Sequence, residues 1–320
     1  MADKIALIFG ITGQDGYYLS KLLTDKNYKV FGTFHEKNPA KEFKLINLGV
    51  NLIFCNINNE ESVVAILSQI KPEEIYNLAG QSSVRDSWDN PSSYIQTNSI
   101  GVSNILNALV NPKLNLNQTR FFQASSSEMF GETTDSPANE RHLISPNSPY
   151  GASKALGHNL VGIYRKSHGC YAISGILFNH ESPLRDSTYL SKKISSGVVK
   201  IFRGEAEEIM LGNLDVSRDW SFAGDVMNAA WLTMQQKYPD DYVIASGESK
   251  TVAQFVEEAF LYLGIQNWRR YIRIADKLVR KNEARIVKAD PAKIFEQLKW
   301  KPEYTFEQLV HYLVENELTK

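Results

Sequence analysis

Residues 5–16, Ile5-Ala6-Leu7-Ile8-Phe9-Gly10-Ile11-Thr12-Gly13-Gln14-Asp15-Gly16, are the stretch that decides the fold. The first five residues form an unbroken apolar run, which is typical of a strand buried on both faces of a parallel sheet. Three glycines with the spacing G-x-x-G-x-x-G follow, and a helical pattern through Leu19, Leu22 and Leu23 comes next. A strand, a glycine-rich turn and a helix in this order indicate the first βαβ unit of an α/β fold.

The same alternation continues to residue 178. Further strands are expected at residues 28–34, 52–55, 74–78, 120–123 and 171–178, and helices near residues 40–48, 63–70, 94–110 and 150–166. Strands that alternate with helices at this spacing predict right-handed βαβ units and a doubly wound parallel Rossmann sheet.

After Phe178 the alternation breaks. Residues 179–186 resemble a loop, and helices are expected at 189–203, 225–236, 251–263 and 306–315, with a strand at 242–245 that returns to the main sheet. We therefore expect two interleaved domains. The larger comprises residues 1–178 plus about 225–250, and a smaller C-terminal lobe comprises about 179–224 plus 251–320.

Composition excludes several classes of protein. The chain has 320 residues with 35 basic and 36 acidic side chains, and no basic run suggests a nucleic acid partner. No apolar stretch reaches the roughly 18–20 residues that cross a bilayer, and Met1 leads into a strand rather than a signal peptide. We expect Cys55 and Cys170 to be buried thiols in a protein of a reducing compartment. We expect a cytoplasmic protein that binds no membrane, nucleic acid or metal.

The glycine cluster is suited to a dinucleotide. Glycine is needed where the backbone turns tightly and approaches a pyrophosphate, and the helix that follows offers unpaired N–H donors. A tight turn without a ligand is the alternative, but the buried strand before it and the helix after it favour a dinucleotide-binding larger domain. Asp15 is open to a simpler interpretation, in which it stabilises the first helical turn through the helix dipole.

The end of the second strand bears on which dinucleotide binds. Glu36 lies twenty residues beyond Gly16, where a carboxylate accepts hydrogen bonds from a ribose 2′-OH and disfavours a 2′-phosphate. His35, Lys37 and Lys41, with Lys44 beyond them, could instead neutralise a 2′-phosphate. A solvated charged loop is the third interpretation. Both NAD and NADP therefore stay open.

Two motifs predict a site that handles protons and hydride. Tyr150 and Lys154 are four residues apart, so a helix that begins near Pro149 presents them on one face. A nearby ammonium lowers the pKa of a phenol from its usual value of ~10. Ser126 and Glu128 follow the fifth strand. A hydroxyl can hold a substrate hydroxyl, and a second acid–base group suggests elimination rather than simple alcohol oxidation.

At this point the chain resembles the GDP-mannose 4,6-dehydratases, a family within the extended short-chain dehydrogenases/reductases. The resemblance covers nearly the whole chain and rests on six segments: Gly10–Gly16, Glu74–Leu78, Phe122–Ser125, Gly175–Pro183, Leu211–Asp215 and Arg218–Trp220. It implies that Tyr150 removes the C4 hydroxyl proton while hydride leaves C4, and that Glu128 takes the C5 proton and assists the loss of the C6 hydroxyl as water. Hydride then returns to C6 and leaves a 4-keto-6-deoxy sugar.

The resemblance also assigns residues to ligands, with GDP-mannose or a close relative such as a GDP-manno-heptose as the substrate and NADP or NAD as the cofactor. Catalytic roles fall on Ser126, Glu128, Tyr150 and Lys154. Cofactor contacts fall on Gly10, Thr12, Gly13, Gln14, Asp15, Gly16, His35, Glu36, Asn56, Ile57, Leu78, Ala79, Tyr150 and Lys154. Substrate contacts fall on Ser82, Ser126, Asn179, Lys193, Arg218, Arg280 and Glu283. A C4 oxidoreductase or epimerase on the same scaffold, or a non-catalytic nucleotide-sugar-binding protein, is the alternative.

Several positions depart from the family pattern. Ser126 stands where the family usually has Thr, Asn56 where it has Asp, and Phe9 where it has Thr. His35 and Glu36 replace adjacent arginines that serve a 2′-phosphate and a tetramer contact in the family. NADP preference and tetramer formation therefore do not carry over, and we expect a homodimer through the helices at 94–110 and 150–166.

Overall fold

A seven-stranded sheet forms the centre of the protein in a computed structural model that describes residues 4–133, 136–279 and 282–320. All its strand pairs are parallel, in the order β3-β2-β1-β4-β5-β6-β10, so the predicted doubly wound sheet is confirmed. Its strands are β1 (Ile5–Phe9), β2 (Lys29–Phe34), β3 (Asn51–Phe54), β4 (Glu74–Asn77), β5 (Arg120–Ser126), β6 (Ala172–Leu177) and β10 (Tyr242–Ile244).

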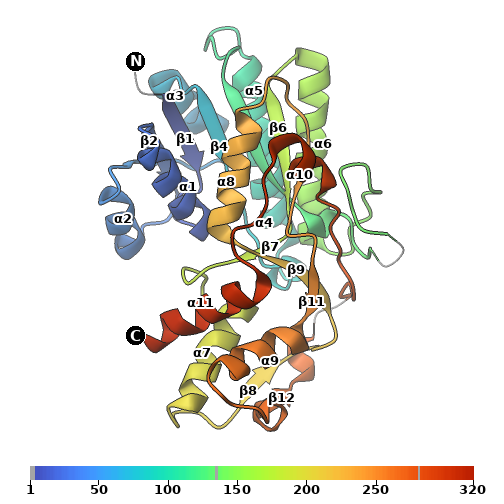
Figure 1. The fold of residues 1–320 in the computed structure, drawn as a ribbon. Helices are drawn as coiled ribbons and strands as arrows, with labels where there is room; N and C mark the ends of the chain where they lie inside the picture. Colours follow the sequence, from blue (N-terminus) through green and yellow to red (C-terminus); the bar gives the residue numbers. More distant parts are fainter. Residues whose placement is uncertain (1–3, 134–135, 280–281) are drawn as a thin grey trace.

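Helices cover both faces of this sheet (Figure 1). Alternate residues of β1 explain why: Ala6 and Ile8 pack in one core, and Leu7 and Phe9 pack in the other. The first core contains α1 (Gln14–Asp25), α8 (Ala223–Met234) and α10 (Ala292–Leu298), and the second contains α3 (Glu60–Ile70), α5 (Gly101–Val110) and α6 (Pro149–His168). The short helix α2 (Pro39–Ile46) precedes β3.

The expected helix at residues 94–110 is instead three pieces. These are α4 (Pro91–Ile95), a π-helical turn η2 (Gln96–Ile100) and α5. Within the π-helical turn, the Asn98 side chain accepts from Gln81 N at 3.0 Å and donates to Gln81 O and to Ser153 Oγ, each at 3.0 Å. The wide turn thus coincides with a polar side chain that ties the helix to the segment after β4 and to α6.

A second group of elements lies below the sheet in Figure 1 and has its own apolar core. Two small sheets, β11-β9-β7 and β12-β8, combine with three helices. The expected loop at 179–186 was wrong in its first three residues, because β7 pairs there with β9. The bounds are β7 (Asn179–Glu181), β8 (Ile209–Leu211), β9 (Ser217–Phe222), β11 (Ser249–Thr251), β12 (Ile272–Ile274), α7 (Leu190–Phe202), α9 (Val252–Tyr262) and α11 (Phe306–Leu318).

Single turns of 3₁₀ helix complete the elements: η1 (Asp86–Trp88), η3 (Ser127–Met129), η4 (Trp268–Tyr271) and η5 (Asp276–Leu278). Thr251 caps α9 in a reciprocal capping box with Gln254. None of the helices within the described ranges is long and apolar enough to span a bilayer.

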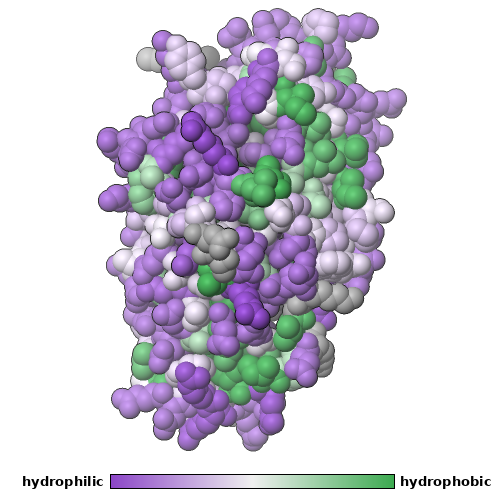
Figure 2. All heavy atoms as spheres, turned by 90° about the vertical axis from the view of Figure 1, so that its right-hand side faces the viewer, coloured by the Kyte–Doolittle hydropathy of each residue, from purple (hydrophilic) through white to green (hydrophobic). Residues whose placement is uncertain are grey.

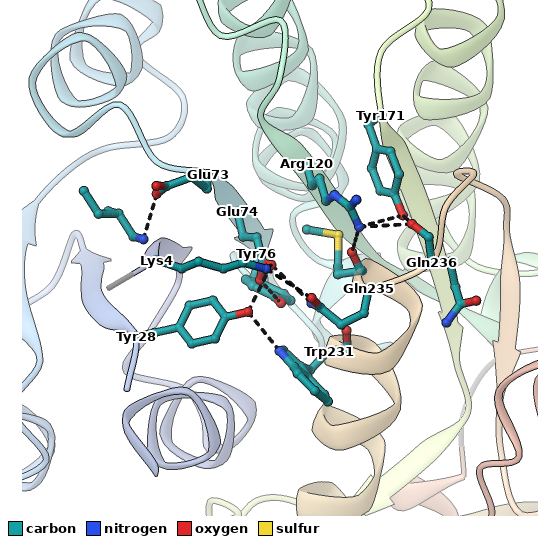
Figure 3. A network of polar contacts seen from close by, with 12 residues as sticks. Lys4, Tyr28, Glu73, Glu74, Tyr76, Arg120, Tyr171, Trp231, Gln235 and Gln236 are labelled. Atoms are coloured by element: carbon teal, nitrogen blue, oxygen red, sulfur yellow. Dashed lines mark hydrogen bonds and ion pairs between the residues drawn. The ribbon is translucent and has the colours of Figure 1, made fainter. Parts of the chain in front are cut away.

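A buried carboxylate fastens the amino edge of the sheet (Figure 3). Glu74, at the start of β4, is only 1% exposed. Its oxygens accept hydrogen bonds from Lys4 Nζ at 3.3 Å, Tyr28 OH at 3.1 Å, Tyr76 OH at 2.7 Å and Gln235 Nε2 at 3.1 Å. Several donors offset the cost of burying this charge, so strands β1, β2 and β4 are linked to the end of α8.

Arg120, at the start of β5, fastens the same end of α8 (Figure 3). Its guanidinium donates to the carbonyl oxygens of Met234 and Gln236 and lies over the Tyr171 ring, 4.4 Å from its centroid. A cation at the last carbonyls of a helix is favourable, because these groups have no partner within the helix. The site described next lies at the opposite, carboxyl edge of the sheet.

Candidate active site

The turn after β1 brings backbone close to backbone. Gly10 has a φ of +76°, and a Cβ atom at this position would lie 2.5 Å from the Cα of Ala79. A Cβ on Gly16 would lie 2.1 Å from the carbonyl oxygen of Ile11. Helix α1 then begins at Gln14 with no side-chain cap, so its first N–H groups face the cavity beyond the turn.

A cavity of about 620 Å³ extends from this turn to the second group of elements. It lies where parallel strands end on either side of β1, which is where open α/β sheets bind ligands. Most predicted site residues line it together: Gly10, Thr12, Gly13, Gln14, Asp15, Gly16, His35, Glu36, Asn56, Ile57, Leu78, Ala79, Ser82, Ser126, Glu128, Tyr150, Lys154, Asn179, Arg218 and Glu283.

The outcome differs for the last two predicted residues. Lys193 lies on α7, outside the lining of the cavity. Arg280 lies outside the described residues. The structure thus brings together the predicted proton-handling groups, the glycine turn and part of the predicted substrate set.

The four predicted catalytic side chains come from three elements: Ser126 from β5, Glu128 from η3, and Tyr150 and Lys154 from α6. Ser126 ends β5, and its Oγ accepts from Glu128 N at 3.3 Å. Ser148 caps α6 by accepting from Gly151 N, so Tyr150 lies in the first turn of that helix. One turn later, Lys154 Nζ donates to the carbonyl oxygen of Ala124 at 2.9 Å.

Burial shifts the pKa of both members of the Tyr–Lys pair. Burial raises the pKa of Tyr150 well above 10, although a hydrogen bond with Ser126 acts in the other direction. Burial lowers the pKa of Lys154 to about 8, although the charge of Asp15 opposes this shift. In the protein without a bound nicotinamide, desolvation of the Tyr150 phenolate outweighs the Ser126 hydrogen bond and the Arg185 charge, so the pKa of Tyr150 is raised rather than lowered.

Sequence reasoning missed a group of polar residues beneath the glycine turn. His180 Nε2 lies 3.0 Å from Asp15 Oδ2, and Gln14 Nε2 donates to the carbonyl oxygen of His180 at 2.9 Å. Burial favours a high pKa for Asp15, but the charge of His180 and its hydrogen bond outweigh it and lower the pKa. The other oxygen of Asp15, Oδ1, is buried without a hydrogen-bond partner.

Three more lining residues also escaped prediction: Glu181, Arg185 and Tyr189. Arg185 Nε donates to Glu181 Oε2 at 3.1 Å, and its guanidinium lies 4.1 Å from the centroid of the Tyr189 ring. The signal was present in the sequence, because His180 and Glu181 belong to the quoted segment Gly175–Pro183. Only Asn179 had been assigned a role there.

The far end of the cavity, after β2, is open to solvent. The side chains of His35 and Glu36 are 68% and 85% exposed, with His35 Nε2 3.5 Å from Glu36 Oε1. Lys41 also lines this end. The Glu36 carboxylate suits the 2′-OH of NAD, whereas the Lys41 ammonium suits the 2′-phosphate of NADP. Both cofactors therefore stay open.

The opposite end of the cavity is formed by β9 and the segment around Glu283. Arg218 on β9 is buried, and its neighbour Asp219 anchors the strand. Asp219 accepts from Ser246 N and Ser246 Oγ, each at 2.9 Å, and from Gly247 N at 2.7 Å. Burial nevertheless raises the pKa of Asp219 to about 6. No group of His, Cys, Asp and Glu within the described ranges could hold a metal ion.

Solved structures of similar fold define the class of protein. UDP-glucose 4-epimerase from Thermotoga maritima, solved with UDP-glucose, superposes with a TM-score of 0.85 at 23% identity and covers 98% of both chains. dTDP-glucose 4,6-dehydratase from Bacillus anthracis, solved with NAD, has a TM-score of 0.84 at 21% identity, covering 98% of this chain and 96% of that one. The chain therefore shares the fold of these nucleotide-sugar epimerases and dehydratases.

Sequence relatives narrow this class. GDP-mannose 4,6 dehydratase 1 of Arabidopsis thaliana is 39% identical over 98% of this chain and 90% of its own length. The human GDP-mannose 4,6 dehydratase is 35% identical over 97% and 90%, and that of Vibrio cholerae is 32% identical over 99% and 94%. The sequence model described as GDP-mannose 4,6 dehydratase matches residues 7–313. The chain belongs to the GDP-mannose 4,6-dehydratase family, and the predicted family and hydro-lyase class are confirmed.

Proposed function

We propose that the protein is a GDP-mannose 4,6-dehydratase, which removes one water molecule from GDP-mannose or a close GDP-sugar and forms the 4-keto-6-deoxy product. One observation carries the proposal: Glu128 lines the same cavity as Ser126, Tyr150 and Lys154. A second acid–base group beside the Tyr–Lys pair is needed for elimination and is superfluous for a simple reductase. Family membership supports the choice of a GDP-sugar.

The residues fit a nicotinamide dinucleotide, either NAD or NADP. The glycine turn lines the cavity at Gly10, Gly13 and Gly16, where the absence of side chains lets a pyrophosphate approach the backbone. The unpartnered Asp15 Oδ1 is a buried acceptor that a ligand hydroxyl or amide can satisfy. When bound, the nicotinamide supplies an acceptor for the C4 hydride and later the donor of that hydride to C6.

The protein's own residues move the protons. Tyr150 takes the proton of the C4 hydroxyl while Ser126 holds that hydroxyl, so a C4 ketone forms as hydride leaves. The Lys154 ammonium stabilises the phenolate. A phenol buried as deeply as Tyr150 needs such positive charge to ionise, because burial raises its pKa.

Glu128 carries out the elimination. The C4 ketone acidifies the C5–H bond, and the Glu128 carboxylate removes that proton. The C6–O bond then breaks, the departing oxygen takes a proton from the Glu128 carboxylic acid, and water leaves as a C5=C6 double bond forms. Hydride returns to C6 and C5 takes a proton from solvent, while Tyr150 releases to solvent the proton that it took from the C4 hydroxyl. The protons therefore balance, one water is lost and no net oxidation occurs.

The remaining residues hold the GDP-sugar. Arg218 suits the diphosphate as a buried cation, and Glu283 suits ribose hydroxyls or guanine N–H groups. Ser82 and Asn179 line the cavity at the sugar, whereas Lys193 and Arg280 are assigned to the substrate by resemblance alone. The division into residues 1–178 plus about 225–250 for cofactor and about 179–224 plus 251–320 for substrate, the homodimer and the cytoplasmic location belong to the same proposal.

The test is an activity assay with defined products. The protein is incubated with GDP-mannose, or with a GDP-manno-heptose, in the presence of NAD or NADP, and the products are analysed by mass spectrometry. We expect a product lighter by one water molecule with a 4-ketone, and no net reduction of the dinucleotide. A product of unchanged mass with inverted C4 would indicate an epimerase, and stoichiometric consumption of dinucleotide would indicate an oxidoreductase.

The Glu128→Gln variant tests whether Glu128 carries out the elimination. Loss of the acid–base group should lower the dehydration rate by about 10² to 10⁴. Dinucleotide affinity, measured by calorimetry, should stay at the wild-type value because the glycine turn is untouched. Dehydration at the wild-type rate in this variant would remove Glu128 from the mechanism.

A further inference from the structure

Residues 282–290 form a strap between the two groups of elements. Ala289 forms a parallel bridge with Ala138, in the segment that follows Glu128. On its other side, Ile286 forms a parallel bridge with Ser217, at the start of the strand that carries Arg218. The backbone of the strap therefore links the segment that follows Glu128 to the start of β9.

Glu132 fastens the middle of the strap. Its two carboxylate oxygens accept from the backbone N–H groups of Arg285 at 3.0 Å and Ile286 at 2.8 Å. Hydrogen bonds to an ionised acceptor are shorter and stronger than neutral ones. Glu132 follows Glu128 by four residues, so this contact ties the strap to the catalytic segment.

A reciprocal amide pair fastens the start of the strap. Asn147 Nδ2 donates to the carbonyl oxygen of Asn282 at 2.8 Å, and Asn282 Nδ2 donates to that of Asn147 at 3.2 Å. Asn282 has a φ of +49°, a left-handed conformation that asparagine tolerates better than most residues. Asn147 precedes Ser148, the cap of the helix that carries Tyr150.

The strap forms part of the wall of the active site. Glu283 lines the main cavity and also a small adjoining cavity. Glu128, Arg218, Asn147 and Asn282 line that small cavity with it. The Asn147–Asn282 pair therefore adjoins the place where the elimination residue and the proposed substrate residues meet. The Glu132 contact lies just beyond it, because Arg285 follows Ala284, another residue that lines the small cavity.

We propose that Glu132 and the Asn147–Asn282 pair are positioning residues that fix Glu283 and its strap over the nucleotide-sugar end of the cavity. They set the affinity for the GDP portion of the substrate and leave the dinucleotide end unaffected. This inference rests on the proposed function, because it takes the occupant of that end to be a GDP-sugar.

The test compares Glu132→Gln with a matched control. An amide keeps one acceptor but turns its NH₂ group toward one of the two backbone donors, so the strap loses one bond and a charge. We expect the Kd for GDP, measured by calorimetry on the full chain, and the KM for GDP-mannose each to rise by roughly tenfold. The Kd for the dinucleotide, kcat and the melting temperature should stay close to wild type.

Glu73→Gln is the control, because Glu73 also accepts a backbone bond, from Ile5 N at 2.7 Å, but at the opposite edge of the sheet. It should leave both GDP affinity and KM unchanged. Asn147→Ala should raise the Kd for GDP in the same direction as Glu132→Gln.

Two results would overturn the inference: an unchanged Kd for GDP in Glu132→Gln, or a parallel loss of GDP affinity, dinucleotide affinity and melting temperature. Wild-type protein that fails to bind GDP would also overturn it. Wild-type protein that binds GDP but dehydrates no GDP-sugar would instead contradict the proposed function, and the GDP titrations would still decide the role of Glu132.

Discussion

Tyr150 and Lys154 are both buried, and burial disfavours the charged form of each side chain. Lys154 therefore loses its proton at a lower pH than an exposed lysine, whereas Tyr150 keeps its proton to a higher pH than an exposed tyrosine. Because the proposed mechanism needs an ammonium beside the phenolate, the useful state of the pair depends on Lys154 remaining charged.

The pH dependence of kcat/KM should show the loss of the Lys154 charge. With the Lys154 pKa at about 8, its charge is present below pH 8 and lost above it, so kcat/KM should fall on the alkaline side of pH 8. Lys154→Arg keeps its charge beyond pH 12 and should move this decline upward by about one pH unit or more. A decline at the same pH in wild type and Lys154→Arg would assign it to another group.

The residues of the site differ in how well sequence predicts them. The four-residue spacing of Tyr150 and Lys154 places both side chains on one face of a helix, and the glycine spacing specifies the turn. Both features could therefore be predicted from short stretches of sequence. His180 belonged to a quoted segment, but the local sequence does not show that it reaches the cavity, because its position there depends on the pairing of β7 with β9. Lys193 was predicted from a motif position, and α7 holds it away from the cavity lining.

Helix α8 is held at both ends by side chains distant in sequence. Near its start, Asp225 Oδ2 accepts from the backbone N–H groups of Glu303 at 3.0 Å and Tyr304 at 3.1 Å. At its end, Arg120 binds the last carbonyls. These contacts attach the helix to β5 and to the segment that leads into α11.

Asp225 makes stability depend on pH. Burial raises its pKa from 3.8 to about 6. The folded state therefore holds the proton more tightly than the unfolded chain, so its contribution is complete below pH 3.8 and is lost as pH rises to about 6, by at most about 3 kcal/mol. Asp225→Asn should remove this loss, because one amide oxygen can accept both backbone bonds.

Urea unfolding between pH 4 and pH 7 would check this, with the variant matching wild type near pH 4 and exceeding it near pH 7. Asp89→Asn, at an exposed position, controls for the change in net charge. A constant difference between wild type and Asp225→Asn across that range would contradict the prediction.

Long or deeply buried helices and strands were easier to predict from the sequence than short or exposed ones. The apolar runs of β1, β2 and β4 gave their strands to within about one residue, because both faces of each strand are buried. Strands β7 and β8, each of three residues, were not predicted, and tertiary pairing creates them. The equally short strand β10 was predicted, because all three of its residues are apolar and buried. The π-helical turn at Gln96–Ile100 likewise depends on contacts of Asn98 that the local sequence does not encode.

At the scale of the whole molecule, one side of the sheet carries an exposed apolar face. Ile95, Ile100, Leu156 and Ile163, from α4, η2 and α6, are each between 40% and 54% exposed. Figure 2 views the side on which α6 lies and shows hydrophobic patches over its upper half. These residues support the predicted homodimer through these helices, since such faces commonly mark protein interfaces.

Negative charges introduced on this face by substitution should dissociate the dimer into monomers. Leu156 and Ile163 are seven residues apart and lie on one stripe of α6, so a Leu156→Glu/Ile163→Glu variant places two carboxylates at the centre of the interface. We expect a wild-type dimer and a monomeric variant by light scattering. Phe202→Glu, on the exposed end of α7, should remain a dimer. A monomeric wild-type protein, or a variant that stays dimeric, would contradict the prediction.

The position of β10 has a consequence for synthesis of the chain. Strand β10 covers the edge of β6 and completes the sheet, yet it is made long after the strands it joins. Until residue 244 has left the ribosome, β6 presents an open parallel edge, and the Arg120 guanidinium lacks the carbonyl groups of Met234 and Gln236. Closure of the sheet is therefore a late, long-range step in the folding of the chain.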